Sequence, residues 1–444
     1  MRMQETNLFW GARRRKARMV RAEGVYLWDN TGKRYLDGSS GPMTCNIGHG
    51  NAAVLAAMQA QMQNATFGMR LHFETDPAEH LATRLADIAP GDLKQVFYTS
   101  GGSEAVESAL KLARCHALAT GEAQRWKVIS RFPSYHGCTL GALSVSGYAP
   151  MSAPFDPMLV QMPKIPAPRA YLDGLDIDDP ATGHYYADML EEQILREGPE
   201  TVLAFLHEPI GGASTGALVP PAGYMQRIRE ICDRYGVLLI HDEVISGGGR
   251  VGTFFAGDLW GVTPDLITLS KGFGAGYMPL GAVILRASIA DPVLDTANYL
   301  HGFTYGGNPL ACAAGLAVLD EINDQDMMVN AVAQGQVLRA RLEALMQRYE
   351  IIGDVRGMGL LQAFELMSDR ETRAPLPKEW NAYDRLVEIA YENGLIIYAR
   401  RTRGGLEGDH FLIAPPMIST EEQIDEIMET LTASLDQFMT EIPT

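Results

Sequence analysis

Residues 265–274 read Asp-Leu-Ile-Thr-Leu-Ser-Lys-Gly-Phe-Gly, and this stretch decides which fold the sequence predicts. Most residues before Lys271 are apolar or compatible with a strand, and a glycine-rich turn follows at once. Such a run predicts a buried strand that delivers an amine to the rim of a sheet. Burial favours the neutral amine, which can form a Schiff base with an aldehyde. Taken alone, the stretch fits a lysine exposed at the surface better than a buried one. The features in the rest of the chain reverse that preference.

Length and composition narrow the classes of protein. The chain has 444 residues, which is more than one typical domain core supports. Its formal net charge of −17 argues against a nucleic-acid partner. The five scattered cysteines form no CxxC pair, which argues against a metal site and fits a reducing compartment. No apolar run is long enough for a membrane span, so we expect a cytoplasmic protein with no membrane partner.

Strand-like and helix-like segments alternate from about residue 50 to about residue 310. The apolar runs are 95–98, 127–130, 202–206, 237–240 and 266–269, and the clearest helical stretches are 103–119 and 224–235. This alternation predicts an α/β fold, in which helices cover both faces of a mostly parallel sheet. The segment from 150 to 200 is rich in Pro, Asp and Gly and predicts long loops.

The two ends of the chain predict a smaller α+β domain. Asp-Asn-Thr-Gly at 29–32 lies between two short apolar runs, which is typical of a β-hairpin. Beyond residue 311, strands are expected near 359–365 and 395–398, followed by a helix at 420–438. We therefore divide the chain into an N-terminal arm and hairpin (1–55), a large domain (56–310) and a C-terminal part of the small domain (311–444).

Polar or glycine-rich features follow several of the predicted strands. They are residues 99–104, residues 132–137, Glu208, Asp242 and Lys271. In open parallel sheets, ligands bind at the carboxyl ends of the strands, so these features predict one common site.

Each feature also has a purely structural interpretation. The glycine turn before Ser103 opens a helix and suits a phosphate, but Ser103 could be an ordinary N-cap. Asp242 needs a partner, either a protonated pyridine nitrogen or a structural one such as Arg250. Tyr135 could stack on a flat cofactor or only pack. Taken together, a phosphate cup, an aromatic wall, a buried acid and a lysine are the parts that pyridoxal 5'-phosphate requires.

The chain resembles the class III, or omega, aminotransferases, which are pyridoxal-phosphate enzymes of fold type I. The resemblance covers about residues 20 to 430. The stretches that carry it are 100–105, 135–137, 208–210, 241–244, 270–272 and 301–305. It implies an aspartate-aminotransferase-like fold with a seven-stranded, mostly parallel sheet.

The resemblance also implies roles for individual residues. Lys271 is implied as the Schiff-base lysine and proton carrier, and Asp242 as the partner of the pyridine nitrogen. The other implied cofactor-binding residues are Gly102, Ser103, Tyr135, His136, Glu208, Val244 and Thr304. Thr304 would reach the phosphate of a neighbouring subunit, which implies a homodimer with shared active sites and leaves a tetramer open.

The substrate pocket departs from the family pattern. Relatives that use amines and pyruvate often carry Leu-Trp where Pro42 and Met43 stand, so Met43 is expected in the pocket. Such relatives also place an arginine ahead of a Gly-Asp pair to bind the acceptor carboxylate. Here the candidates are Arg400, Arg401 and Arg403, and the sequence does not choose among them.

The expected reaction moves an amino group from an amine or omega-amino acid to a keto acid, with pyruvate favoured over 2-oxoglutarate, by a ping-pong mechanism. An aminomutase, a racemase or a dialkylglycine-type decarboxylase would need the same lysine and acid. A regulator that binds the cofactor is the third hypothesis. The net charge and the short N-terminal arm argue against its usual DNA-binding segment.

Overall fold

The computed structural model describes residues 7, 9, 16–296 and 299–442. Its large sheet has seven strands in the order β4-β10-β9-β8-β7-β5-β6. Their bounds are β4 (Leu93–Thr99), β5 (Lys127–Phe132), β6 (Lys164–Pro166), β7 (Val202–His207), β8 (Leu238–Asp242), β9 (Leu266–Leu269) and β10 (Gly281–Arg286). In this sheet β10 runs antiparallel to both of its neighbours, β4 and β9, and the other neighbouring strands pair in parallel. The prediction of a mostly parallel sheet is confirmed.

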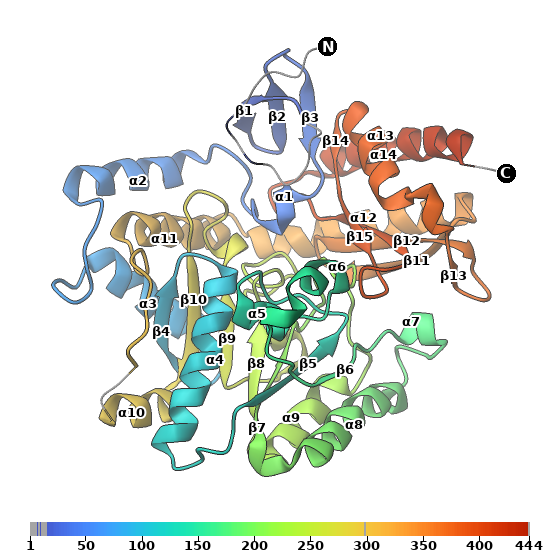
Figure 1. The fold of residues 1–444 in the computed structure, drawn as a ribbon. Helices are drawn as coiled ribbons and strands as arrows, with labels where there is room; N and C mark the ends of the chain where they lie inside the picture. Colours follow the sequence, from blue (N-terminus) through green and yellow to red (C-terminus); the bar gives the residue numbers. More distant parts are fainter. Residues whose placement is uncertain (1–6, 8, 10–15, 297–298, 443–444) are drawn as a thin grey trace.

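Helices cover both faces of this sheet (Figure 1). The helices around it are α4 (Gly102–Ala119), α8 (Pro180–Glu197), α9 (Tyr224–Tyr235) and α10 (Ala287–Asp295). Every residue of β7 is buried, because its side chains alternate between two apolar layers. Leu206 packs in the layer with α4, and Phe205 packs in the layer with α8 and α9.

The prediction of long loops between residues 150 and 200 is wrong. The segment holds α6 (Ala149–Ser152), a 3-10 turn (Ala153–Met158), β6, α7 (Ala170–Asp173) and α8. The Asp179 side chain accepts a hydrogen bond from the N–H of Ala181, and Pro180 occupies the first turn of α8. Asp and Pro therefore act here as signals that start a helix, not as signals of a loop.

Both ends of the chain join in smaller sheets. One contains β1 (Met19–Glu23), β2 (Tyr26–Asp29), β3 (Arg34–Asp37) and β14 (Leu395–Ile396), with β3 parallel to β14. The other contains β11 (Ile352–Met358), β12 (Leu361–Asp369), β13 (Ala374–Pro375), β15 (Tyr398–Arg401) and β16 (Asp409–Ile413). The expected hairpin is present, since the Asp29 carboxylate accepts the N–H groups of Thr31 and Lys33 within its turn.

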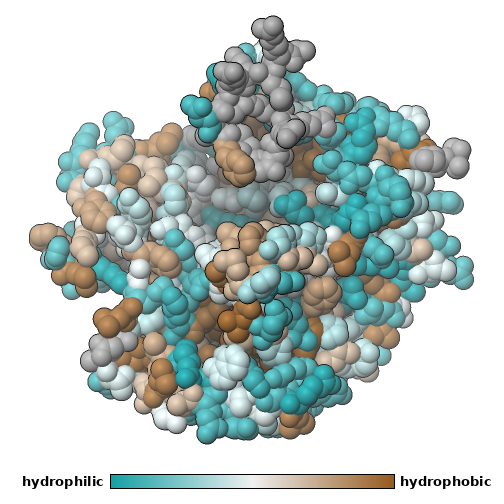
Figure 2. Space-filling view, viewed as in Figure 1, coloured by the Kyte–Doolittle hydropathy of each residue, from teal (hydrophilic) through white to brown (hydrophobic). Residues whose placement is uncertain are grey.

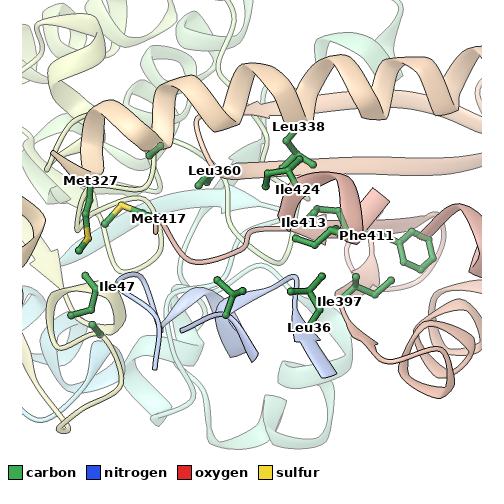
Figure 3. Close-up of a cluster of buried hydrophobic side chains, with 14 of the residues drawn as sticks. Leu36, Ile47, Met327, Leu338, Leu360, Ile397, Phe411, Ile413, Met417 and Ile424 are labelled. Carbon is green, nitrogen blue, oxygen red and sulfur yellow. The ribbon is translucent and has the colours of Figure 1, made fainter. Parts of the chain in front are cut away.

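The remaining helices pack around the three sheets or against other helices. They are α1 (Ser40–Met43), α2 (Ala52–Asn64), α3 (Asp76–Ile88), α5 (Leu140–Ser144), α11 (Pro309–Asp324), α12 (Met327–Arg348), α13 (Ala382–Glu392) and α14 (Glu421–Glu441). Figure 3 shows Leu36 lying beside Ile397 and Ile413 in the apolar core that both chain ends share. The domain boundaries at 55/56 and 310/311 stay a prediction. No helix within the described ranges is long and apolar enough to cross a membrane.

Candidate active site

The carboxyl ends of four neighbouring strands bring the expected side chains together. Asp242 is the last residue of β8, and Lys271 follows the adjacent strand β9. Glu208 follows β7, and His136 lies beyond the end of β5. His136, Glu208 and Asp242 are buried. The strand order therefore places an amine, two carboxylates and an imidazole at one edge of the sheet, as ligand sites of such sheets require.

The Asp242 carboxylate is held by three groups. Its Oδ2 lies 2.7 Å from His136 Nδ1, and its Oδ1 accepts the Val244 N–H at 3.1 Å and the Thr268 hydroxyl at 3.2 Å. A carboxylate has about four acceptor positions, so one is left for a further donor. Arg250 is not a partner of Asp242, because it donates instead to Asn46 and to the carbonyl of Leu360.

Two buried polar atoms near Asp242 have no partner among the described residues. One is His136 Nε2, and the other is Glu208 Oε2. Glu208 Oε1 accepts the Gly212 N–H at 2.8 Å, and burial raises the pKa of this carboxyl. Because unpaired polar atoms are costly in an interior, each of these two atoms is a candidate contact for a polar ligand or a bound water.

The Lys271 amine has an environment that suits a nucleophile. Desolvation lowers its pKa to about 8, although the charges of Asp242 and Glu208 act in the opposite direction. Lys271 also has a φ of +48°, in the left-handed region that favours glycine. A strained backbone at such a position is typical of a functional site.

The glycine turn forms a cup at the start of α4. The N-cap of α4 is Gly101, so Ser103 does not cap the helix; its Oγ accepts the Cys138 N–H at 3.0 Å instead. A Cβ on Gly102 would lie 2.9 Å from Val244 Cγ1, so only glycine allows this close approach. The N–H groups in the first turn of a helix are suited to a phosphate.

A cavity of about 240 Å³ opens above Lys271. Its lining residues are Pro42, Met43, Tyr135, Tyr148, Met151, Ala213, Ser214, Ile245, Lys271, Tyr398 and Arg400. Burial raises the pKa of Tyr135 to about 12, so its hydroxyl is neutral. Sequence reasoning missed Tyr148, Met151, Ala213, Ser214 and Tyr398. Of these, only Tyr398 could have been found from the sequence. It precedes Arg400 by two residues on a strand, so both side chains lie on the same face.

The structure separates the three candidate arginines. Arg400 lines the cavity. Arg401, the next residue on β15, points to the opposite face and lies over the Tyr383 ring. Arg403 donates to the carbonyl of Arg373, away from the cavity. Thr304 is exposed and also lies outside the cavity lining.

Comparison with known proteins identifies the family. The family model described as aminotransferase class-III matches residues 11–435. The chain belongs to this family. It is 35% identical to the putrescine–pyruvate aminotransferase of Pseudomonas aeruginosa, over 94% of this chain and 90% of that one.

Two solved structures have the same fold. An (S)-enantioselective omega-transaminase from Thermomicrobium roseum superimposes with a TM-score of 0.92, at 36% identity, covering 99% of this chain and 96% of that one. A pyridoxal-phosphate-bound amine transaminase from an uncultivated Pseudomonas species superimposes with a TM-score of 0.91, at 35% identity. The match covers 98% of this chain and 99% of that one. The protein is thus an aminotransferase of fold type I.

The cofactor of this class III aminotransferase is pyridoxal phosphate, and the observed groups fit it. The cup at α4 offers donors for a phosphate, and Asp242 has an acceptor position left for a protonated ring nitrogen. The unpartnered His136 and Glu208 atoms lie at the same end of the sheet. Within the described residues, no group of three or more His, Cys, Asp or Glu side chains could hold a metal ion.

Proposed function

We propose that this aminotransferase moves an amino group from an amine or omega-amino acid to a keto acid, pyruvate in preference to 2-oxoglutarate, by a ping-pong mechanism. The observation that carries the proposal is a single small cavity that contains both Lys271 and Arg400. One cavity of about 240 Å³ has to serve the donor and the acceptor in turn, which supports a small keto acid. The Pseudomonas aeruginosa relative, named for putrescine and pyruvate, supports the same choice.

Different residues of the chain have different roles in the proposed reaction. Pyridoxal phosphate, when bound, supplies an aldehyde and an electron sink. The N–H groups of Gly102 and Ser103 would hold its phosphate, and Asp242 would hold its ring nitrogen in the protonated form. Tyr135 and Val244 would lie against the ring. Lys271 Nζ, with a pKa of about 8, is partly neutral at physiological pH and can take a proton from the substrate carbon and return it.

Arg400 is the residue that we propose for the acceptor carboxylate. Its guanidinium lies 4.6 Å from the centre of the Tyr398 ring and donates to the carbonyl of Ala399. No carboxylate of the described residues pairs with it. A guanidinium in a cavity without an acidic partner attracts a carboxylate and can bind it through two hydrogen bonds.

We also propose that the protein is a homodimer. Exposed apolar side chains gather on α2, on the loop after it and on the loop before α11, and Figure 2 shows brown patches over this part of the molecule. They are Leu55, Met62, Phe67, Met69, Leu71, Phe73, Leu300 and Tyr305. Arg70 donates to the carbonyl of His301, so the two loops form one surface, which includes Thr304. Exposed apolar surface of this kind marks an interaction site.

Sedimentation velocity tests the oligomeric state. We expect a species of about twice 48.5 kDa at micromolar concentration. Replacing Leu71 and Phe73 by serine should weaken the dimer, because both side chains are more than two-thirds exposed in the monomer. A monomer for the unmodified protein would contradict the proposal, and a species of four chains would show a tetramer.

Two half-reactions test the proposed function. The visible absorbance of the cofactor-loaded protein should decrease when an amine is added and return when pyruvate is added. Lys271→Ala should lower the rate of both half-reactions by about 10²- to 10⁴-fold, the usual contribution of a positioned acid–base group. An amine that is consumed or racemised without any exchange of its amino group with a keto acid would contradict transamination.

The role of Arg400 is tested by Arg400→Leu, with Arg401→Leu as the matched control. Loss of a charge-assisted pair costs about 1.5–3 kcal/mol, so kcat/KM for pyruvate should fall about 10- to 100-fold in Arg400→Leu. The value for an aldehyde acceptor without a carboxylate should change little. Arg401→Leu should behave like the unmodified protein with both acceptors. An equal loss for the two acceptors in Arg400→Leu would rule out a carboxylate contact.

A further inference from the structure

The loop that follows β7 forms one wall of the substrate cavity. Ala213 and Ser214 line the cavity from this loop. The loop closes on itself, because the Gly211 N–H donates to the Leu218 carbonyl at 2.8 Å and the Gly216 N–H donates to the Gly212 carbonyl at 2.9 Å. The remaining carbonyls of the loop need donors from elsewhere.

The C-terminal sheet supplies these donors. His410 Nε2, on β16, lies 2.9 Å from the Ala213 carbonyl oxygen. Arg356, on β11, donates to the carbonyls of Thr215 at 2.9 Å and Gly216 at 2.7 Å. Two side chains of the C-terminal sheet therefore hold three carbonyls of this loop, those of residues 213, 215 and 216.

The protonation of His410 follows from its partners. A carbonyl oxygen only accepts, so His410 Nε2 carries the proton. Its Nδ1 then accepts a hydrogen bond from the Thr402 hydroxyl at 3.0 Å. Burial lowers the pKa of His410 to about 3, with a further contribution from the charge of Arg356. The imidazole is therefore neutral over the physiological range, and both of its hydrogen bonds persist there.

A second cavity lies on the other side of the same loop. Its volume is about 540 Å³, and Thr215, Leu218, Arg356 and Thr402 are among the residues that line it. The segment 213–216 is thus a partition, with Ala213 and Ser214 facing the substrate cavity and Thr215 facing the second cavity. If the partition were released, the second cavity would offer it space on the side of Thr215.

We propose that His410 is a positioning residue that limits the size of the amine substrate, because it holds the 213–216 partition between the two cavities. This inference rests on the proposed function. His410 does not line the substrate cavity, and its Nε2 contacts the wall at the Ala213 carbonyl. The partition itself has only small side chains at the cavity, so its position, more than its bulk, sets the available space.

The test compares two variants of the cofactor-loaded enzyme. His410→Phe keeps a ring of similar volume and removes the donor, and His410→Gln offers a donor near the place of Nε2. The measured quantity is the ratio of kcat/KM for 1-(2-naphthyl)ethylamine to that for 1-phenylethylamine, two donors that differ by one fused ring. We expect this ratio to rise about fivefold or more in His410→Phe. Such a rise is a modest part of the discrimination between substrates that the size of a pocket provides. In His410→Gln the ratio should stay near that of the unmodified enzyme.

Arg339→Met is the matched control. Arg339 lines the second cavity and donates to two backbone carbonyls of β11, those of Val355 and Gly357, but among the described residues it donates no hydrogen bond to the partition. Its loss should leave the ratio unchanged, whatever it does to stability. A similar rise of the ratio in Arg339→Met would overturn the assignment to His410.

A second variant disturbs the same contact from the loop. A Cβ on Gly216 would lie 2.7 Å from the His410 ring, and the φ of +66° there disfavours other residues, so Gly216→Ala should raise the ratio too. An equal fall of both kcat/KM values in His410→Phe and Gly216→Ala would show a purely structural role and overturn the inference alone. An unmodified enzyme that transfers no amino group from any amine or omega-amino acid in the half-reactions described above would overturn the proposed function with it.

Discussion

The active site depends on a partly buried amine beside a buried carboxylate at the ends of two adjacent parallel strands. Removing both groups from water is costly unless each finds partners. Asp242 is held by His136, Val244 and Thr268, whereas Lys271 gains only the more distant attraction of Asp242 and Glu208. As a result, the Asp242 carboxylate is firmly held, whereas the Lys271 amine loses its proton easily. Lys271 also lines the substrate cavity, so the amine of this pair can reach a bound substrate.

Much of the large sheet could be predicted because its strands are short apolar runs that end in polar residues. The bounds of β9 and α9 match the predicted 266–269 and 224–235. The antiparallel strand β10 was missed, since an apolar run such as 281–286 has no periodicity that separates strand from helix. Helix α8 was missed because Asp and Pro signal both turns and helix starts. The local sequence pattern therefore predicts buried strands well. It predicts poorly the boundaries at which the same residues can signal a turn or the start of a helix.

The site could be predicted only where its residues follow strand ends. That rule located Glu208, Asp242 and Lys271. It could not choose between the two arginines of β15, because that choice depends on which face of the strand meets the cavity. The far wall of the cavity comes from segments distant in sequence. His410 and Ala213 are 197 positions apart, and no sequence pattern indicates that they touch. Such contacts are set by how the C-terminal sheet packs on the large one.

Competitive acylation of the cofactor-free protein, read at the peptide that contains Lys271, tests the central claim most directly. The reagent reacts only with a neutral amine, so labelling should rise with pH through a midpoint of about 8 and then level off. Because the charge of Asp242 raises this pKa, Asp242→Asn should move the midpoint to lower pH. A midpoint near the ordinary value of 10.5 would contradict the account, because Lys271 would then be a charged, solvated lysine with no special reactivity.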